Sequence, residues 1–236
     1  MKVLVIIPCY NEEANIEQVI TRLRAAYPEG DYLVVNDCST DASARILAEK
    51  GYNHLNLPVN LGIGGGVQSG YLYAMENGYD ITVQMDGDGQ HDPAYLRAVA
   101  APVAEGKLDM CVGSRFITKK GFQTSALRRF GIRILSGLIR LLTGAKVKDV
   151  TSGFRACNRK LTAFYAGNYA HDYPEPEAII SAVLRGFTVG EVPVVMHERQ
   201  GGESSISPLK SAYYMVKVCI SLVVYRIILS RKKGDT

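Results

Sequence analysis

The chain has 236 residues, of which 47% are hydrophobic and 21% charged, and its formal net charge is +4. These values exclude a disordered chain and fit one globular domain with a sizeable core. The charge is mild and forms no basic stripe with stacking aromatics, so we expect no nucleic acid partner. The five cysteines show no C-x-x-C spacing, which excludes a zinc ribbon or thioredoxin-type motif and favours a reducing compartment.

The first half of the chain alternates strand and helix patterns. The expected strands cover residues 3–7, 32–35, 81–85 and 110–113, and the expected helices cover 12–26, 41–50, 65–77 and 93–105. The first strand follows Met1 and Lys2 directly, without the apolar stretch of a signal peptide, so we expect a cytosolic protein. This alternation predicts an α/β sandwich whose ligand-binding loops follow the carboxyl ends of its strands.

Residues 125–144 are predicted to form an amphipathic helix with a basic and an apolar face. At about 100° per residue, three arginines share one narrow face: Arg129, Arg133 and Arg140. Another face is aromatic and aliphatic, and carries Phe130, Ile134, Leu138, Leu141 and Leu142. This pattern is typical of a helix lying in a membrane interface, and it equally fits a core helix with a solvated arginine stripe.

The C-terminal segment, residues 208–233, is a second apolar helix candidate. Residues 212–230 are apolar apart from a few polar positions and two charges, Lys217 and Arg226. A spanning helix needs roughly 20 residues with few charges, and these two charges fall on opposite faces. We therefore expect an interfacial helix, or one docked on a small membrane-protein partner, rather than a span. A terminal helix packed on the domain is the alternative.

The string Met85 to Pro93 (MDGDGQHDP) carries the main chemical signal. Asp86 and Asp88 follow a predicted buried strand and, in an extended stretch, project toward the same side. Clustered carboxylates repel each other, and such oxygens suit Mg²⁺ or Mn²⁺ with diphosphate oxygens completing the shell. An acidic surface turn is the alternative interpretation.

Two further loops suggest nucleotide binding. Asn36 and Asp37 follow the second expected strand, where an amide and a carboxylate suit the edges of a base or ribose. Nearby Asp41 equally fits the cap of the next helix. Residues 60–66 (NLGIGGG) form a glycine-rich loop that opens a helix and presents amides to phosphate. This loop lacks both the Rossmann and the P-loop frames.

Eight strings, in order along nearly the whole chain, resemble glycosyltransferase family 2. The closest similarity is to its polyprenyl-phosphate branch, the dolichol-phosphate mannose synthase-like enzymes. The strings are IPCYNEE, NDCSTD, NLGIGGGVQSG, MDGDGQHDP, GSRF, DVTSGFRA, YPEPE and EVPVVMHERQGGESSI. The resemblance implies a type-A glycosyltransferase fold, a Rossmann-like nucleotide-binding sandwich. We accordingly assign residues 1–206 to the catalytic domain, 115–206 to its acceptor-binding half, and 207–236 to a membrane-interface helix.

The resemblance also implies roles for individual residues. Nucleotide-sugar binding would fall to Pro8, Tyr10, Glu12, Asn36, Asp37, Gly62 and Asp86, and the Mg²⁺ or Mn²⁺ site to Asp86, Asp88 and Gln90. The acceptor would be held by Arg115, Arg155, Glu175, Glu177, Arg199, Ser204 and Ser205, with Asp88 and the three arginines as the catalytic set. Guanidinium groups suit phosphate oxygens.

Two departures from the pattern affect this transfer of roles. Many relatives have an aspartate where Asn36 stands, which affects base recognition. Many also have a lysine where Glu203 stands, which removes a positive charge near the expected phosphate pocket.

The charges predict an inverting reaction in which a metal-bound nucleotide-diphosphate sugar is attacked by a polyprenyl phosphate at the cytoplasmic membrane face. A lipid phosphate is already ionised and needs no general base, whereas a sugar hydroxyl would need Glu175 or Glu177. UDP-glucose, UDP-N-acetylglucosamine and GDP-mannose remain open as donors. The alternatives are a family 2 enzyme that extends a lipid-linked or capsular glycan at a hydroxyl, and a non-catalytic nucleotide-sugar-binding protein.

Overall fold

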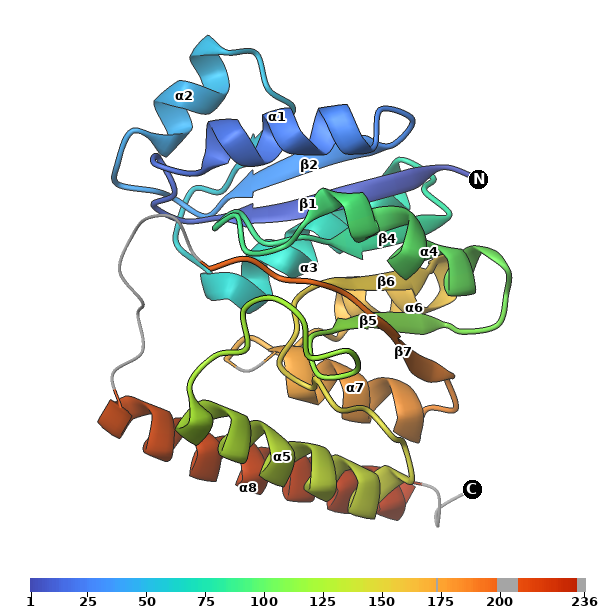
Figure 1. Cartoon of the computed structure of the whole chain (residues 1–236). Helices are drawn as coiled ribbons and strands as arrows, with labels where there is room; N and C mark the ends of the chain where they lie inside the picture. The colour runs from blue at the N-terminus through green and yellow to red at the C-terminus, as the bar shows by residue number, and fades with distance from the viewer. Residues whose placement is uncertain (173, 199–207, 233–236) are drawn as a thin grey trace.

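A computed structural model describes residues 1–172, 174–198 and 208–232. Within these residues, seven strands form one mixed sheet in the order β3-β2-β1-β4-β6-β5-β7 (Figure 1). The strands are β1 (Val3–Cys9), β2 (Asp31–Asn36), β3 (His54–Asn56), β4 (Ile81–Gln84), β5 (Met110–Ser114), β6 (Arg155–Asn158) and β7 (Val189–Pro193). Strand β6 runs antiparallel to both of its neighbours, whereas the other pairs are parallel.

Helices cover both faces of this sheet (Figure 1). They are α1 (Ile16–Ala26), α2 (Ser43–Glu49), α3 (Gly62–Glu76), α4 (Leu96–Ala104), α5 (Ala126–Thr143), α6 (Arg159–Gly167), α7 (Pro174–Leu184) and α8 (Pro208–Lys232). One core lies under α1, α2 and α4. A second core joins the other face of the sheet to α3, α6 and α7, and α5 and α8 extend it outward side by side.

The first half of the chain matches the expected elements to within a few residues. The apolar run of β1 is buried on both faces of the sheet, and α1 buries the face that its periodicity predicts: Ile16, Val19, Ile20 and Leu23. Asp92 caps the short turn before α4 and accepts a hydrogen bond from the Ala94 amide. Strands β3 and β6 have no counterpart among the expected strands, and β6 lies between β4 and β5 in the sheet.

Helix α5 has three faces instead of the expected two. One is buried in the core and carries Ile132, Leu135 and Ile139. The second, the exposed apolar face, consists of Leu127, Phe130, Ile134 and Leu141. The third, the cationic face, consists of Arg129, Arg133 and Arg140. The helix therefore packs on the domain and still presents apolar side chains to the outside.

Helix α8 is likewise packed on one side and open on another. Val218 and Leu222 are fully buried against the core. Lys217, one of its two isolated charges, forms an ion pair with Asp172 at 2.7 Å. Exposed apolar side chains continue along its outer side: Val216, Ile220, Val223, Val224, Ile227 and Ile228. Within the described part of the chain, the structure has no helix with the length and apolarity that a membrane crossing requires.

Candidate active site

A cavity of about 1030 Å³ opens at the carboxyl end of β4 and extends along α5 and α8. Its polar end contains Asp86, Asp88, Gln90, Arg115, Arg128 and Glu175. Its apolar end contains Leu127, Phe130 and Ile134 of α5, with Val216 and Ile220 of α8. One continuous space therefore joins the acidic motif to the exposed apolar side chains of both helices.

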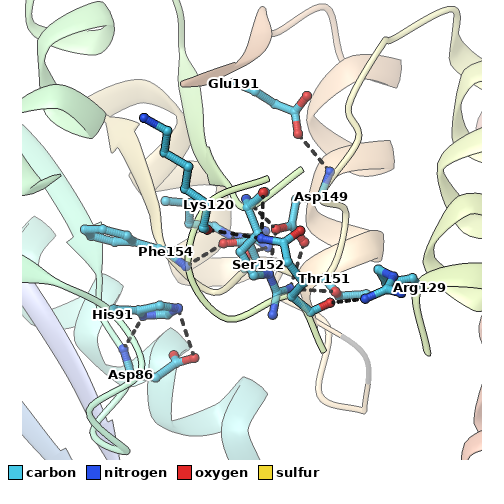
Figure 2. A network of polar contacts seen from close by, with 12 residues as sticks. Asp86, His91, Lys120, Arg129, Asp149, Thr151, Ser152, Phe154 and Glu191 are labelled. Carbon is cyan, nitrogen blue, oxygen red and sulfur yellow. Dashed lines mark hydrogen bonds and ion pairs between the residues drawn. The ribbon is translucent and has the colours of Figure 1, made fainter. Parts of the chain in front are cut away.

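The Asp86 carboxylate is held in place by its neighbours (Figure 2). Its Oδ1 accepts a hydrogen bond from Gln84 Nε2 at 3.1 Å. The Asp86 amide donates to His91 Nδ1 at 3.0 Å, so a neutral His91 ring carries its proton on Nε2, 3.8 Å from Asp86 Oδ2. The His91 ring stacks on Phe154 with 5.0 Å between ring centroids. The imidazole is thus fixed as a support for Asp86.

Asp88 reaches the same cavity from a turn and not from the extended stretch that the sequence predicts. Strand β4 ends at Gln84, and Gly87 and Asp88 form the turn that follows. Asp88 Oδ1 accepts a hydrogen bond from the Gln90 amide at 3.0 Å. The turn returns Asp88 to the side on which Asp86 lies, which explains why both line one cavity.

The acidic end of the cavity has the side chains of a metal site in which protein and diphosphate oxygens together hold the cation. Within the described residues, no three His, Cys, Asp or Glu side chains converge as a complete metal cluster. The cavity offers two carboxylates, Asp86 and Asp88, and the amide oxygen of Gln90. Mg²⁺ is commonly held by one or two carboxylates together with substrate phosphates. The donor set therefore fits a divalent cation bound jointly with the nucleotide.

Gly153 leaves the space that the Asp86 carboxylate occupies. A methyl group added at Gly153 would lie 2.7 Å and 2.8 Å from the two Asp86 carboxylate oxygens. We expect Gly153→Ala to displace this carboxylate and lower catalytic activity about tenfold, because small misplacements in a reacting site are costly. Gly167→Ala, where an added methyl group meets nothing within 4 Å, is the control and should keep full activity. Equal activity of the two variants would show that the position of Asp86 is not critical.

Arg115 lines the cavity and is almost fully buried. Its Nε and Nη2 donate to the two carboxylate oxygens of Asp149, each at 2.8 Å, and its amide donates to the same carboxylate at 3.0 Å. The Asp149 amide in turn donates to Glu191 Oε1 at 2.8 Å (Figure 2). This network fixes the orientation of the Arg115 guanidinium, so it is a preset part of the wall.

Arg155 lies behind the cavity wall, although the resemblance places it among the phosphate contacts. Its side chain is fully buried and does not line the cavity. The guanidinium donates to the carbonyl oxygens of Ser152 at 2.5 Å and Glu175 at 3.2 Å. Direct contact with an acceptor phosphate would require this wall to open. In this structure Arg155 positions the two segments that carry Ser152 and Glu175.

The two glutamates of the YPEPE string point to different places. Glu175 lines the cavity, and burial raises the pKa of its carboxyl, with the Arg155 charge opposing the shift. Glu177 Oε1 accepts a hydrogen bond from Ser221 Oγ of α8 at 2.6 Å and lies outside the cavity lining. Glu177 therefore connects α7 to α8, and Glu175 faces the site.

Arg128 is a cavity residue that the sequence analysis did not select. It lies in the first turn of α5 and lines the cavity, and its charge, like that of Arg155, opposes the rise in the pKa of Glu175 that burial causes. At about 100° per residue, position 128 falls on the same side of α5 as the buried Ile132, Leu135 and Ile139, although the Arg128 side chain is exposed. A cation in register with the core-facing residues of an amphipathic helix is the sequence signal that could have identified it.

The expected nucleotide residues gather at the carboxyl ends of β1 and β2, next to the acidic turn. Pro8 lies near the carboxyl end of β1, Tyr10 and Glu12 follow the strand, and Tyr10 is 48% exposed. Asp37 Oδ1 accepts a hydrogen bond from the Leu61 amide at 2.7 Å and so closes the loop that leads to Gly62 and α3.

Asn36, at the end of β2, has both ends of its amide engaged. Its Nδ2 donates to Asn56 Oδ1 at 2.8 Å, and its Oδ1 accepts from the Ser39 amide at 3.3 Å. Asn36 thus shapes this edge of the sheet. Arg199, Ser204 and Ser205 lie outside the described residues.

Solved structures show which fold this is. Glucosyl-3-phosphoglycerate synthase from Mycobacterium tuberculosis, in complex with Mn²⁺, UDP-glucose and phosphoglyceric acid, has a TM-score of 0.69 to this chain. The match covers 95% of this chain and 79% of that chain at 21% identity. The same enzyme with Mg²⁺ and UDP has a TM-score of 0.68. The chain has the type-A glycosyltransferase fold, and these structural relatives bind Mg²⁺ or Mn²⁺.

Sequence comparison identifies the family. An undecaprenyl-phosphate mannosyltransferase of Micrococcus luteus is 32% identical over 219 residues, which are 88% of this chain and 88% of the relative. A UDP-N-acetylglucosamine–dolichyl-phosphate N-acetylglucosaminyltransferase of Methanococcus voltae is 31% identical and covers 81% of this chain and 84% of its own. The model of glycosyl transferase family 2 matches residues 4–164. The chain therefore belongs to glycosyltransferase family 2 and is a glycosyltransferase.

Proposed function

We propose that this enzyme transfers a sugar, with inversion, from a nucleotide-diphosphate sugar to a polyprenyl phosphate at the cytoplasmic face of a membrane. The observation that carries the proposal is the cavity with two unlike ends. Carboxylates and arginines gather at one end, and exposed apolar side chains of α5 and α8 line the other. A phosphate on a long hydrocarbon chain has the same division between a charged end and an apolar end.

The cavity residues have distinct roles in this reaction. Asp86, Asp88 and Gln90 would hold a Mg²⁺ or Mn²⁺ at the diphosphate end of the donor, and this cation would stabilise the charge on the leaving nucleoside diphosphate. Arg128 and the preset Arg115 attract the acceptor phosphate, as guanidinium groups suit phosphate oxygens. That phosphate is ionised at neutral pH, so its oxygen attacks the anomeric carbon without a general base.

The membrane supplies the acceptor, and α5 and α8 are suited to meet it. Four apolar side chains of α5 and six of α8 are exposed on the outer side of the domain. Exposed apolar patches of this kind mark membrane or protein interaction sites. We infer that the two helices lie on the membrane surface, so that a lipid tail enters between them. A small membrane-protein partner on α8 is the alternative occupant.

A transfer assay tests this function. Purified protein is mixed with short-chain polyprenyl phosphate, MnCl₂ and radiolabelled UDP-glucose, UDP-N-acetylglucosamine or GDP-mannose. Label should move into the organic phase with one of these donors and stop moving when EDTA is added. Nucleotide-sugar binding without transfer to any acceptor would contradict the proposal and indicate a non-catalytic binding protein.

Glu175 distinguishes a phosphate acceptor from a hydroxyl acceptor. A hydroxyl needs a base, and Glu175 lines the cavity with a raised pKa, which suits proton transfer. With a lipid phosphate, we expect Glu175→Gln to retain transfer to within about tenfold, because no proton has to be removed. If Glu175 is a base, the rate should fall by a factor of about 10² to 10⁴. The wild-type rate would then also rise with pH through the raised pKa of Glu175, since the base works when ionised.

A further inference from the structure

The cavity that joins Asp86 to α5 and α8 is called the acceptor cavity. A second cavity, of about 740 Å³, lies on the other side of α5. Five cationic side chains line it: Lys119, Arg129, Arg133, Arg140 and Lys148. Among the described residues, no carboxylate lines this cavity and none forms an ion pair with these five. We propose that this cationic cavity binds the phosphate head group of an anionic membrane lipid, separately from the acceptor.

The cationic cavity differs from two arginine sites of the described chain in which a carboxylate pairs with the guanidinium. Arg97 meets Glu29 with two hydrogen bonds of 2.8 Å, and Arg115 meets Asp149 in the same two-point manner. Five cations around one hollow repel each other, and an anion bound among them relieves that repulsion. Their number therefore points to an anion whose oxygens can contact several cations at once, as those of a phosphate group can.

One of the five cations is already held in position. Arg129 is half-buried, and its Nη1 donates to the Thr124 carbonyl at 2.9 Å. Arg133, Arg140 and Lys148 are exposed around it and can close on a ligand. A fixed guanidinium with exposed cations nearby is suited to the tetrahedral oxygens of phosphate.

The position of the cavity identifies a lipid, not free phosphate, as the occupant. At about 100° per residue, the cationic face of α5 lies beside the exposed apolar face, and the buried face lies behind both. Leu127 and Leu141, at opposite ends of that apolar face, are 70% and 82% exposed. When such a face enters the hydrocarbon boundary, the arginines beside it reach the depth of lipid head groups. The cavity then meets the phosphates of the leaflet.

Vesicle flotation tests the proposal with two variants of equal charge. Arg133→Gln/Arg140→Gln changes the cavity, and Arg24→Gln/Arg159→Gln removes two exposed arginines from other helices. On phosphatidylcholine vesicles with phosphatidylglycerol, the cavity variant should bind roughly tenfold more weakly than wild type, since each cation at the surface contributes to lipid attraction. The control variant should bind like wild type, and pure phosphatidylcholine should not distinguish the three proteins.

Three outcomes would overturn the proposal. They are equal weakening of both variants, wild-type binding by the cavity variant, and displacement from anionic vesicles by inorganic phosphate beyond that caused by chloride at the same ionic strength. Sugar transfer to polyprenyl phosphate in detergent, measured on the same variants, should match wild type. A failure of the proposed function would appear in that transfer assay and would leave the vesicle result intact.

Discussion

Replacing Asp88 with alanine is expected to lower sugar transfer by about a thousandfold. Asp88 lines the polar end of the acceptor cavity beside Asp86, and both carboxylates face the place where the diphosphate carries charge. Loss of one carboxylate weakens the hold on the divalent cation and on the developing negative charge. The fold should remain, because the substitution removes a hydrogen bond within a half-buried turn, worth about 1 kcal/mol.

Initial rates of label transfer at saturating donor, together with thermal melting, check this prediction. Asp88→Asn is the matched variant, since it keeps an acceptor oxygen for the Gln90 amide and removes the charge by replacing the other oxygen with an NH₂ group. Its rate should also be strongly reduced. Glu105→Ala, an exposed carboxylate paired with Lys107, should leave transfer unchanged. If Asp88→Ala keeps a rate within about tenfold of wild type, the diphosphate is held elsewhere.

The elements predicted correctly from the sequence are those with a simple period or a long apolar run. The continuous apolar residues of β1 and the stripe of α1 identify both elements and their buried faces. Strand β6 has no such pattern, because it begins with a charged residue, Arg155. Its guanidinium is tolerated in the interior because it donates hydrogen bonds to backbone carbonyl oxygens. Helix α7 begins with Pro174 and contains Pro176. Two prolines so close together argue against a helix in the sequence, although a proline is well suited to the first helical position.

Some residues of the candidate site could be located from the sequence, whereas others are brought together only by tertiary packing. Asp86 and Asp88 follow a recognisable strand, so their location was accessible from sequence order. The partner of Arg115 is Asp149, 34 residues later, and only the packing of β5 against the loop before β6 brings the two together. Glu175 and Glu177 belong to the same YPEPE string, and the sequence does not separate their roles. In the structure they point in different directions, because residues two positions apart on a helix do not share a face.

Replacing Asp149 with alanine is expected to destabilise the protein by about 3–5 kcal/mol. The Asp149 side chain is fully buried and accepts hydrogen bonds from three donors of Arg115, at 2.8, 2.8 and 3.0 Å. Without it, the guanidinium of Arg115 stays buried with its charge uncompensated. For a chain of this size, the melting temperature should fall by roughly 10 °C. Transfer should fall as well, because the wall of the acceptor cavity loses its fixed arginine.

The double variant Arg115→Met/Asp149→Leu separates the structural and the functional role of this pair. It removes both charges and keeps apolar side chains of similar volume, so its stability should return to within about 1–2 kcal/mol of wild type. Transfer to polyprenyl phosphate should stay low, because the cavity has lost a cation that attracts the acceptor. A double variant as unstable as Asp149→Ala would show that the buried charge is not the cause of the instability. Recovery of transfer together with stability would make Arg115 a structural residue, and Arg128 would then be the principal cation facing the acceptor phosphate among the described residues.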